Sequence, residues 1–128
     1  MESSSVSKIK LTLEIRGKAK LSCELKRHLS PRTVGIIARA IPLEGNAHLM
    51  GNNIVYLETS VNSGLDRPRQ DFKKGDIAYL PANGSICFFI ENSSDVKTMT
   101  PIGKILSEVD SLKEIKSGDV LIFYPETG

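Results

Sequence analysis

The chain has 128 residues, 40% of them hydrophobic and 25% charged, with a net charge of +2. This length predicts one domain with a real core, and the composition excludes a wholly disordered chain. The small net charge argues against nucleic acid or an anionic membrane as partner, and 5% aromatic residues supply no stacking platform for single strands.

Two cysteines, Cys23 and Cys87, are too few for a disulfide framework. No apolar run approaches the ~20 residues of a membrane span, and the first residues lack a stretch of signal-peptide type. We therefore expect a cytoplasmic protein with reduced thiols. Residues 1–7 are expected to form a flexible N-terminal tail, and residues 8–125 a single domain.

Residues 8–25 predict a β-hairpin. Apolar and polar residues alternate from Lys8 to Arg16 and again from Lys18 to Leu25, on either side of Gly17. Alternation with period two across a glycine indicates two strands with one wet face. Cys23 falls on the dry face, so we expect it to be packed.

A helix is predicted next, opening at Ser30 and Pro31 and ending at Pro42. Serine can cap a helix, proline suits its first position, and the residue before a proline disfavours helix. One apolar face is formed by residues at helical spacing: Val34, Ile37, Ala38 and Ile41.

Residues 46–61 predict a second hairpin that turns at Gly51-Asn52-Asn53, since these residues tolerate positive φ. Residues 62–74 are polar with weak periodicity, which predicts a loop, and a loop of this length is often functional or mobile. Residues 76–90 predict two strands joined by a turn at Pro81–Gly84.

The remaining elements are a polar connection over 91–101, a short strand over 103–106, a short amphipathic helix and a strand over 117–124. The helix is predicted from Val109, Leu112 and Ile115, spaced three apart. Gly-Asp precedes the strands at 76 and 119, with glycine expected to turn and aspartate to bond locally. About eight short strands favour a closed barrel or a sandwich.

Three segments, in this order, resemble the cyclophilins, which are peptidyl-prolyl isomerases. SPRTVGIIARAIPLEGN is similar to their first helix and the loop after it, GDIAYLPANGSICFFI to the strands lining the substrate groove, and PIGKILSEVDSLKEIKSGDV to a Gly-Lys strand and the helix following it. The chain most resembles the small archaeal and bacterial cyclophilin-like proteins, whose role is not established. The resemblance implies a mainly β fold, a closed cyclophilin-like barrel of about eight strands with two short helices.

The resemblance does not extend to the isomerase chemistry. Ala47-His48-Leu49-Met50 stands where cyclophilins have an arginine, and residues 91–101 lack their tryptophan and histidine. Aligning the Phe-Phe-Ile runs puts Phe89 on the phenylalanine of the groove floor and Cys87 where the family has glutamine. We therefore expect prolyl isomerase activity to be weak or absent.

The groove candidates are His48, Met50, Tyr56, Glu58, Tyr79, Cys87 and Phe89. Tyr56 and Glu58 share a face of the second hairpin, and the hairpin register decides whether His48 joins them. Cys87 is either a packed thiol or a nucleophile paired with His48. No metal site and no cofactor are expected, because the two histidines have no Cys or carboxylate at ligand spacing.

Three functions remain open. The first is a binding module whose groove takes a small molecule or an extended peptide. The second is a weak prolyl isomerase or a related small-molecule enzyme. The third is a structural or interaction protein whose groove is filled by its own side chains. A basic loop at Arg67, Arg69, Lys73 and Lys74 either binds an acidic partner or is simply solvated, and nothing in the sequence sets the oligomeric state.

Overall fold

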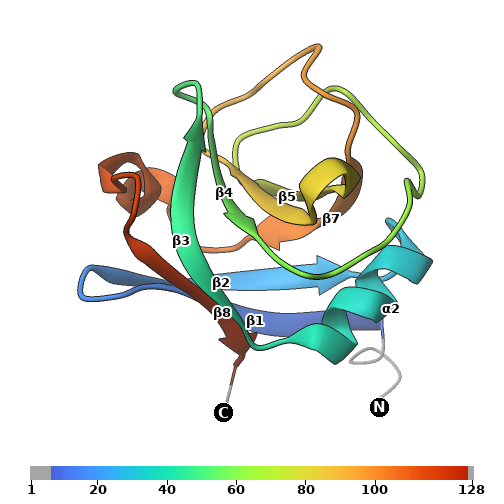
Figure 1. The fold of residues 1–128 in the computed structure, drawn as a ribbon, viewed down its shortest axis with the longest axis horizontal. Coiled ribbons are helices and arrows are strands. Elements are labelled where there is room, and N and C mark those ends of the chain that lie inside the picture. The colour runs from blue at the N-terminus through green and yellow to red at the C-terminus, as the bar shows by residue number, and fades with distance from the viewer. Residues whose placement is uncertain (1–6, 127–128) are drawn as a thin grey trace.

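A computed structural model describes residues 7–126, so the expected tail lies outside the described residues except for Ser7. Eight strands and three short helices make up this part of the chain (Figure 1). The strands are β1 (Lys8–Ile15), β2 (Ala19–Lys26), β3 (Leu43–Met50), β4 (Ile54–Glu58), β5 (Asp76–Leu80), β6 (Ser85–Phe89), β7 (Thr100–Ile105) and β8 (Val120–Pro125). The helices are α2 (Pro31–Ala40) and two 3₁₀ helices, η1 (Pro81–Asn83) and η2 (Val109–Glu114).

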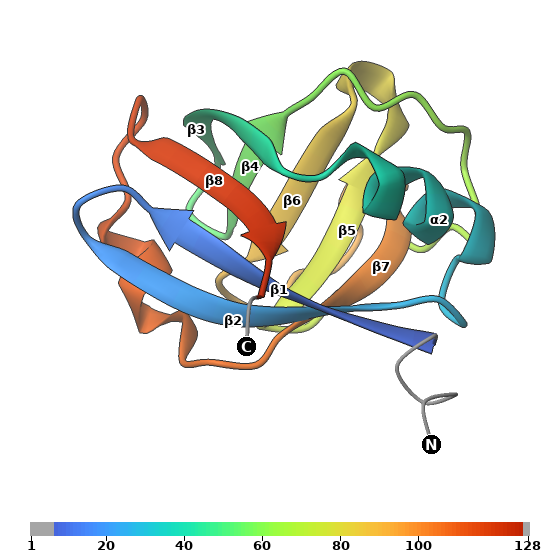
Figure 2. The ribbon, with the colours of Figure 1, turned by 90° about the horizontal axis from the view of Figure 1, so that it is seen from below.

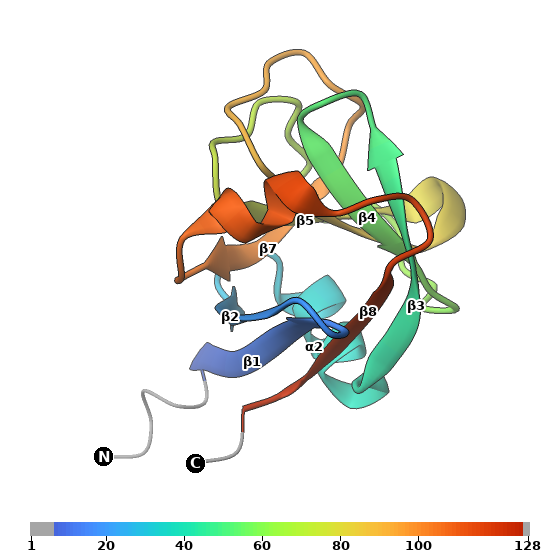
Figure 3. The ribbon, with the colours of Figure 1, turned by 90° about the vertical axis from the view of Figure 1, so that its left-hand side faces the viewer.

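The strands form a closed antiparallel barrel in the order β1-β2-β7-β5-β6-β4-β3-β8, with β8 returning to β1. Figure 3 shows them arranged around a ring. Each of these eight strands is paired with a neighbour on both sides, so none of them is an edge strand of the kind that invites pairing with another chain. The mainly β, closed-barrel prediction is confirmed.

The side chains that point inward at every second strand position fill the barrel interior. Inward side chains from the strands, such as Leu11, Leu13, Phe88 and Phe123, are 0% exposed and belong to one apolar cluster. Phe88 and Phe123 meet edge to face with ring centroids 5.6 Å apart, a geometry that aromatic pairs favour. This cluster is called the interior core.

Helices α2 and η2 cover opposite ends of the barrel. Helix α2 follows β2 and η2 follows β7, and because these two strands are antiparallel neighbours, the elements after them point to opposite ends (Figure 2). Both helices add buried side chains to the interior core, Val34 and Ile37 from α2 and Leu112 from η2. The predicted spacing of three residues suits η2, since a 3₁₀ helix has three residues per turn.

A second apolar cluster lies outside the barrel wall. It combines outward side chains of β4, β5 and β6 with residues of the two long loops over 59–75 and 90–99, which run side by side in Figure 1. Its buried members are Ile54, Phe72, Ala78, Leu80, Cys87, Phe89 and Met99, with Met50, Tyr56 and Val96 partly buried around them. We call this set the outer cluster.

The two long loops are tied together by isolated bridges between Arg69 and Met99 and between Phe72 and Ser93. In the second, Phe72 and Ser93 exchange backbone hydrogen bonds of 2.9 and 2.8 Å. Residues 62–74, predicted as a loop from their polarity, are therefore anchored to a second loop and to the barrel wall by Phe72.

Some boundaries differ from the prediction. Strand β3 begins at Leu43 because its first half pairs with β8, and only Ala47–Met50 forms the predicted hairpin with β4. The side chain of Ser30 does not cap α2. Asp66 takes that role from the long loop, with Oδ2 accepting hydrogen bonds from the backbone N–H groups of Arg32 and Thr33 at 3.1 and 3.4 Å.

The two Gly-Asp pairs at the starts of β5 and β8 form the same local contacts, as predicted. Asp76 Oδ2 accepts a hydrogen bond from the Lys73 N–H at 2.8 Å, and Asp119 Oδ2 accepts one from the Lys116 N–H at 2.9 Å. The glycine before each aspartate has a positive φ, +92° at Gly75 and +98° at Gly118.

Candidate functional site

The exposed face of the second hairpin gathers four of the groove candidates. The register pairs His48 with Tyr56, and their rings stack with centroids 5.1 Å apart. His48 Nε2 lies 3.9 Å from Glu58 Oε1, with both side chains nearly half exposed. Met50 lies further along the same face, half-buried against the outer cluster. This register, which the sequence left open, brings His48 to Tyr56 and Glu58.

Phe89 and Cys87 share this outward face but are closed off from solvent. Both are 0% exposed. The Phe72 ring stacks on Phe89 with centroids 4.7 Å apart, and Met99 lies in the same cluster. Side chains of the two long loops, Phe72 and Met99, therefore cover the residue that the cyclophilin resemblance puts on a groove floor.

Tyr79 does not join the other candidates. It points into the barrel, 0% exposed, as a member of the interior core. Its hydroxyl donates a hydrogen bond to the Val61 carbonyl at 2.7 Å and accepts one from the Ser63 N–H at 3.1 Å. Since Phe89 belongs to the outer cluster, these two groove candidates lie on opposite sides of the barrel wall.

The geometry also separates Cys87 from His48. Tyr56 pairs with each of them on opposite sides, so two strand spacings, about 9–10 Å, lie between their backbones. Burial raises the pKa of the Cys87 thiol to about 12. A buried neutral thiol without a contacting base is a packing group, which is the role expected for most free cysteines.

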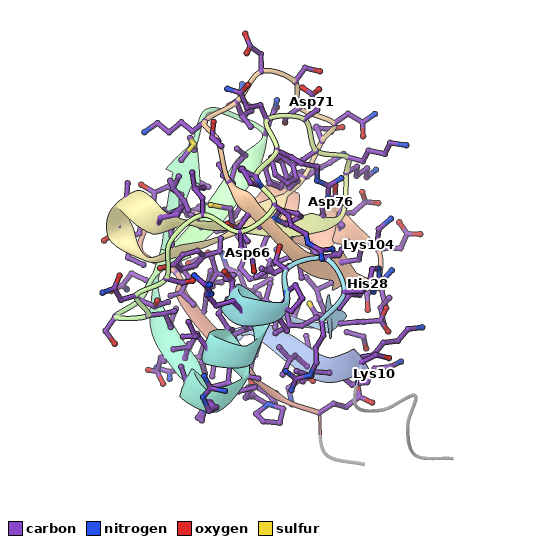
Figure 4. The ribbon with its side chains drawn as sticks, turned by 90° about the vertical axis from the view of Figure 1, so that its right-hand side faces the viewer. Lys10, His28, Asp66, Asp71, Asp76 and Lys104 are labelled. Carbon is purple, nitrogen blue, oxygen red and sulfur yellow. The ribbon has the colours of Figure 1, made fainter. Side chains whose placement is uncertain are left out.

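A large cavity lies beside this face, not on it. It measures about 640 Å³ and opens between the outward sides of β2 and β7 and the two long loops. Figure 4 shows Asp76, Lys104 and His28 along this side of the molecule, below Asp71. Its lining consists of Lys26, His28, Leu29, Arg69, Asp71, Phe72, Lys73, Asp76, Asn92, Ser93, Ser94, Gly103 and Lys104. We call it the charged cleft.

Both carboxylates of the cleft are already hydrogen-bonded to backbone donors. Buried Asp76 accepts from the Lys73 N–H at 2.8 Å, and exposed Asp71 accepts through Oδ1 from the Asp95 N–H at 3.0 Å. These contacts hold the loop backbones in place around the cleft.

The cations of the cleft are less engaged. Lys26 lies 3.8 Å from Glu24. Within residues 7–126, Arg69, Lys73 and Lys104 form no ion pair. The Arg69 guanidinium sits 5.3 Å from the Phe72 ring centroid, a cation–π contact that leaves the edge N–H donors of the guanidinium available.

Two smaller hollows border the second hairpin. One of about 330 Å³ lies between its tip and residues 93–97 and is lined in part by Met50 and Val96. The other, about 270 Å³, lies at the barrel end covered by η2 and is partly lined by the exposed Leu49. Across the described range 7–126, no three His, Cys, Asp or Glu side chains gather to hold a metal ion.

The closed eight-stranded barrel with a helix over each end defines a cyclophilin-like protein. A family model described as cyclophilin-like matches residues 7–124, and the chain therefore belongs to the cyclophilin-like family.

The fold is also similar to the solution structure of the hypothetical protein AF2241 from Archaeoglobus fulgidus. The TM-score is 0.76 at 22% sequence identity, over 94% of this chain and 96% of that one. No curated protein matches the chain. No helix among residues 7–126 is long and apolar enough to cross a membrane.

The charged cleft was not predicted from the amino-acid sequence. Its residues come from β2, β7 and two loops, so no local spacing links them. Two signals pointed toward it: the basic loop, which supplies Arg69 and Lys73, and the Gly-Asp entry, which supplies Asp76. His28 and Lys104 carried no signal of their own.

Proposed function

We propose that this protein is a binding module of the cyclophilin-like family that takes a small molecule, or the end of an extended peptide, in the charged cleft. The cleft carries the proposal because it combines a volume of about 640 Å³ with three cations, Arg69, Lys73 and Lys104, that form no ion pair within residues 7–126. Volumes of this size are typical of small-ligand sites. Phe72 stacks on Phe89, the residue that the cyclophilin resemblance puts on a groove floor.

A thermal-shift screen of neutral, cationic and anionic fragments tests this proposal, because a ligand that binds only the folded state raises the melting temperature. The cleft is blocked by Ser94→Trp, which places a large ring at an exposed lining position. Ser60→Trp is the matched control at an exposed position outside the cleft. We expect shifts that persist in the control and vanish in Ser94→Trp, and shifts that persist in both variants would refute the proposal.

Weak prolyl isomerase activity is the second candidate, favoured by Phe89 at the groove-floor position. It would require Phe72 to leave its 4.7 Å stack on Phe89, and no arginine lies on β3 to stabilise the twisted amide. We expect no acceleration of cis–trans exchange in a panel of Xaa-Pro peptides. Activity that disappears in a His48→Ala, Phe89→Ala double variant would restore the isomerase function.

The third candidate is a structural or interaction protein, which the stack of Phe72 on Phe89 favours because it fills the groove. A cleft that binds no fragment in the screen would make this the better function.

We further propose that the protein acts in the cytoplasm, as the free buried thiols of Cys23 and Cys87 suit a reducing compartment. We propose neither nucleic acid nor membrane as a partner, given the net charge of +2.

A further inference from the structure

We infer that the ligand of the charged cleft is a small anion bearing phosphate or carboxylate groups. The inference rests on the proposed function and adds the chemical class of the ligand. It follows from the charges of the cleft, from which of them are already engaged, and from the polar groups among them.

The lining carries an excess of positive charge. Of the four lining cations, Lys26 lies 3.8 Å from Glu24, which leaves Arg69, Lys73 and Lys104 against Asp71 and Asp76. In a concave site, charges of one sign reinforce one another and raise the local concentration of the opposite ion. The net positive charge of the lining would repel a cationic ligand, and a neutral ligand would not balance that charge.

The cations among the lining residues offer hydrogen-bond donors that no acidic side chain engages, apart from Lys26. Both carboxylates accept backbone N–H bonds, whereas Lys73 and Lys104 form no ion pair within residues 7–126 and Arg69 is held only over the Phe72 ring. An anion would convert these free donors into charge-assisted hydrogen bonds, the strongest kind in proteins.

The cations surround the cavity from separate elements. Lys104 stands on β7 and Arg69 and Lys73 on one long loop, while exposed Ser94 lies on the other. Lys104 is the register partner of Asp76 on one side and of Glu24 on the other, which places it at the floor between strands β2 and β5. An anion bound over Lys104 would therefore be contacted by side chains from the floor and from both loops.

The test is isothermal titration calorimetry at low ionic strength with pyrophosphate and citrate as probes, which separates phosphate from carboxylate recognition. We expect at least one of them to bind, and Lys104→Gln to weaken that binding about tenfold through loss of a charge-assisted bond. Lys10→Gln is the matched control, because Lys10 is an exposed lysine of β1 outside the cleft. The control should bind like the parent.

A second variant is expected to change the affinity for the anion in the opposite direction. Asp71→Asn keeps an oxygen that can accept the Asp95 N–H and removes a negative charge from the lining. Anion binding should tighten several-fold in Asp71→Asn, because the positive excess grows. A change that merely damaged the fold would weaken binding instead, so tightening cannot arise from misfolding.

Three results would overturn the inference: neither probe binding, Lys10→Gln weakening binding as much as Lys104→Gln, or Asp71→Asn weakening it. Failure here is distinguishable from failure of the proposed function. If fragments that bind and are blocked by Ser94→Trp are neutral or cationic, the cleft is a ligand site and only the anion class is wrong. If no fragment is blocked by Ser94→Trp, the site itself is wrong.

Discussion

At the scale of single residues, Cys23 and Cys87 show how burial sets chemistry. Each side chain is 0% exposed, Cys23 in the interior core and Cys87 in the outer cluster. Loss of hydration penalises the charged form, and burial raises the pKa of each thiol from 9.0 to about 12. Both thiols are therefore neutral packing groups at physiological pH.

This shift predicts an alkaline loss of stability. Below pH 9 both states hold the thiol protons, so these groups make stability independent of pH. Between pH 9 and about 12 the unfolded chain releases them first, and the free energy of unfolding falls as pH rises. Urea unfolding across this window should give a shallower fall in a Cys23→Ala, Cys87→Ala variant, since lysines and tyrosines titrate in both proteins. Parallel slopes would contradict the assigned burial effect.

Gly103 marks the closest approach of two strands. A Cβ there would clash with the Glu24 carbonyl oxygen and lie 2.9 Å from Leu25 Cα, and backbone atoms cannot turn aside as a side chain can. Gly103→Ala should lower the free energy of unfolding by about 2 kcal/mol or more. Gly64→Ala, which meets nothing within 4 Å, should stay within about 0.5 kcal/mol of the parent. Equal unfolding midpoints for the two variants would show that β2 and β7 are not this close.

At the scale of elements, Phe72 is a main apolar anchor of the two long loops. Phe72 is 3% exposed, stacks on Phe89 and forms a bridge with Ser93. Met99 and the partly buried Val96 add to this packing, whereas many other residues of the loops are exposed and polar. Local opening of such segments is expected to cost less than global unfolding.

Phe72→Ala should therefore loosen both loops together. We expect a loss of about 3 kcal/mol in stability, as for other buried phenylalanines, and faster hydrogen exchange at the amides of Arg69, Phe72, Ser93 and Met99. Leu65→Ala is the control from the same loop, because Leu65 is 52% exposed and should change neither quantity. Accelerated exchange in only one loop would mean that Phe72 does not join them.

The sequence predicted elements well where neighbours in the chain decide them. The first hairpin follows from alternation around Gly17, and its ends at Lys8 and Lys26 match the structure closely. Helix α2 ends before Pro42 as expected. Its cap was assigned wrongly because Asp66 reaches the helix from 34 residues away, and no local pattern contains such a contact.

At the scale of the whole molecule, the closed barrel separates two environments that the sequence could not tell apart. All residues of β5 and β6 are buried, and most of them are apolar, so no polar alternation marks which side of these strands faces the interior. Tyr79 proved to face the interior and Phe89 the outer cluster. The cover over Phe89 comes from Phe72 in a segment too polar to suggest a packing role.

The charged cleft could not be predicted because its residues are far apart in the sequence. Lys104 and Asp76 are 28 residues apart and become neighbours only when β7 pairs with β5. His28 and Asn92 enter from two further segments. Charged residues are usually exposed to solvent, so only their convergence around one cavity distinguishes these residues. That convergence exists only once the barrel has closed.

The most direct measurement is a ¹H–¹⁵N NMR map of the protein titrated separately with pyrophosphate, citrate and an Xaa-Pro peptide. We predict that the largest shift changes fall on amides around the charged cleft, at residues 73–76, 92–94 and 103–104, with little change at His48 and Tyr56. Changes centred instead on the second hairpin, at His48, Met50 and Tyr56, would place the ligand in the cyclophilin-type groove and contradict the proposed function.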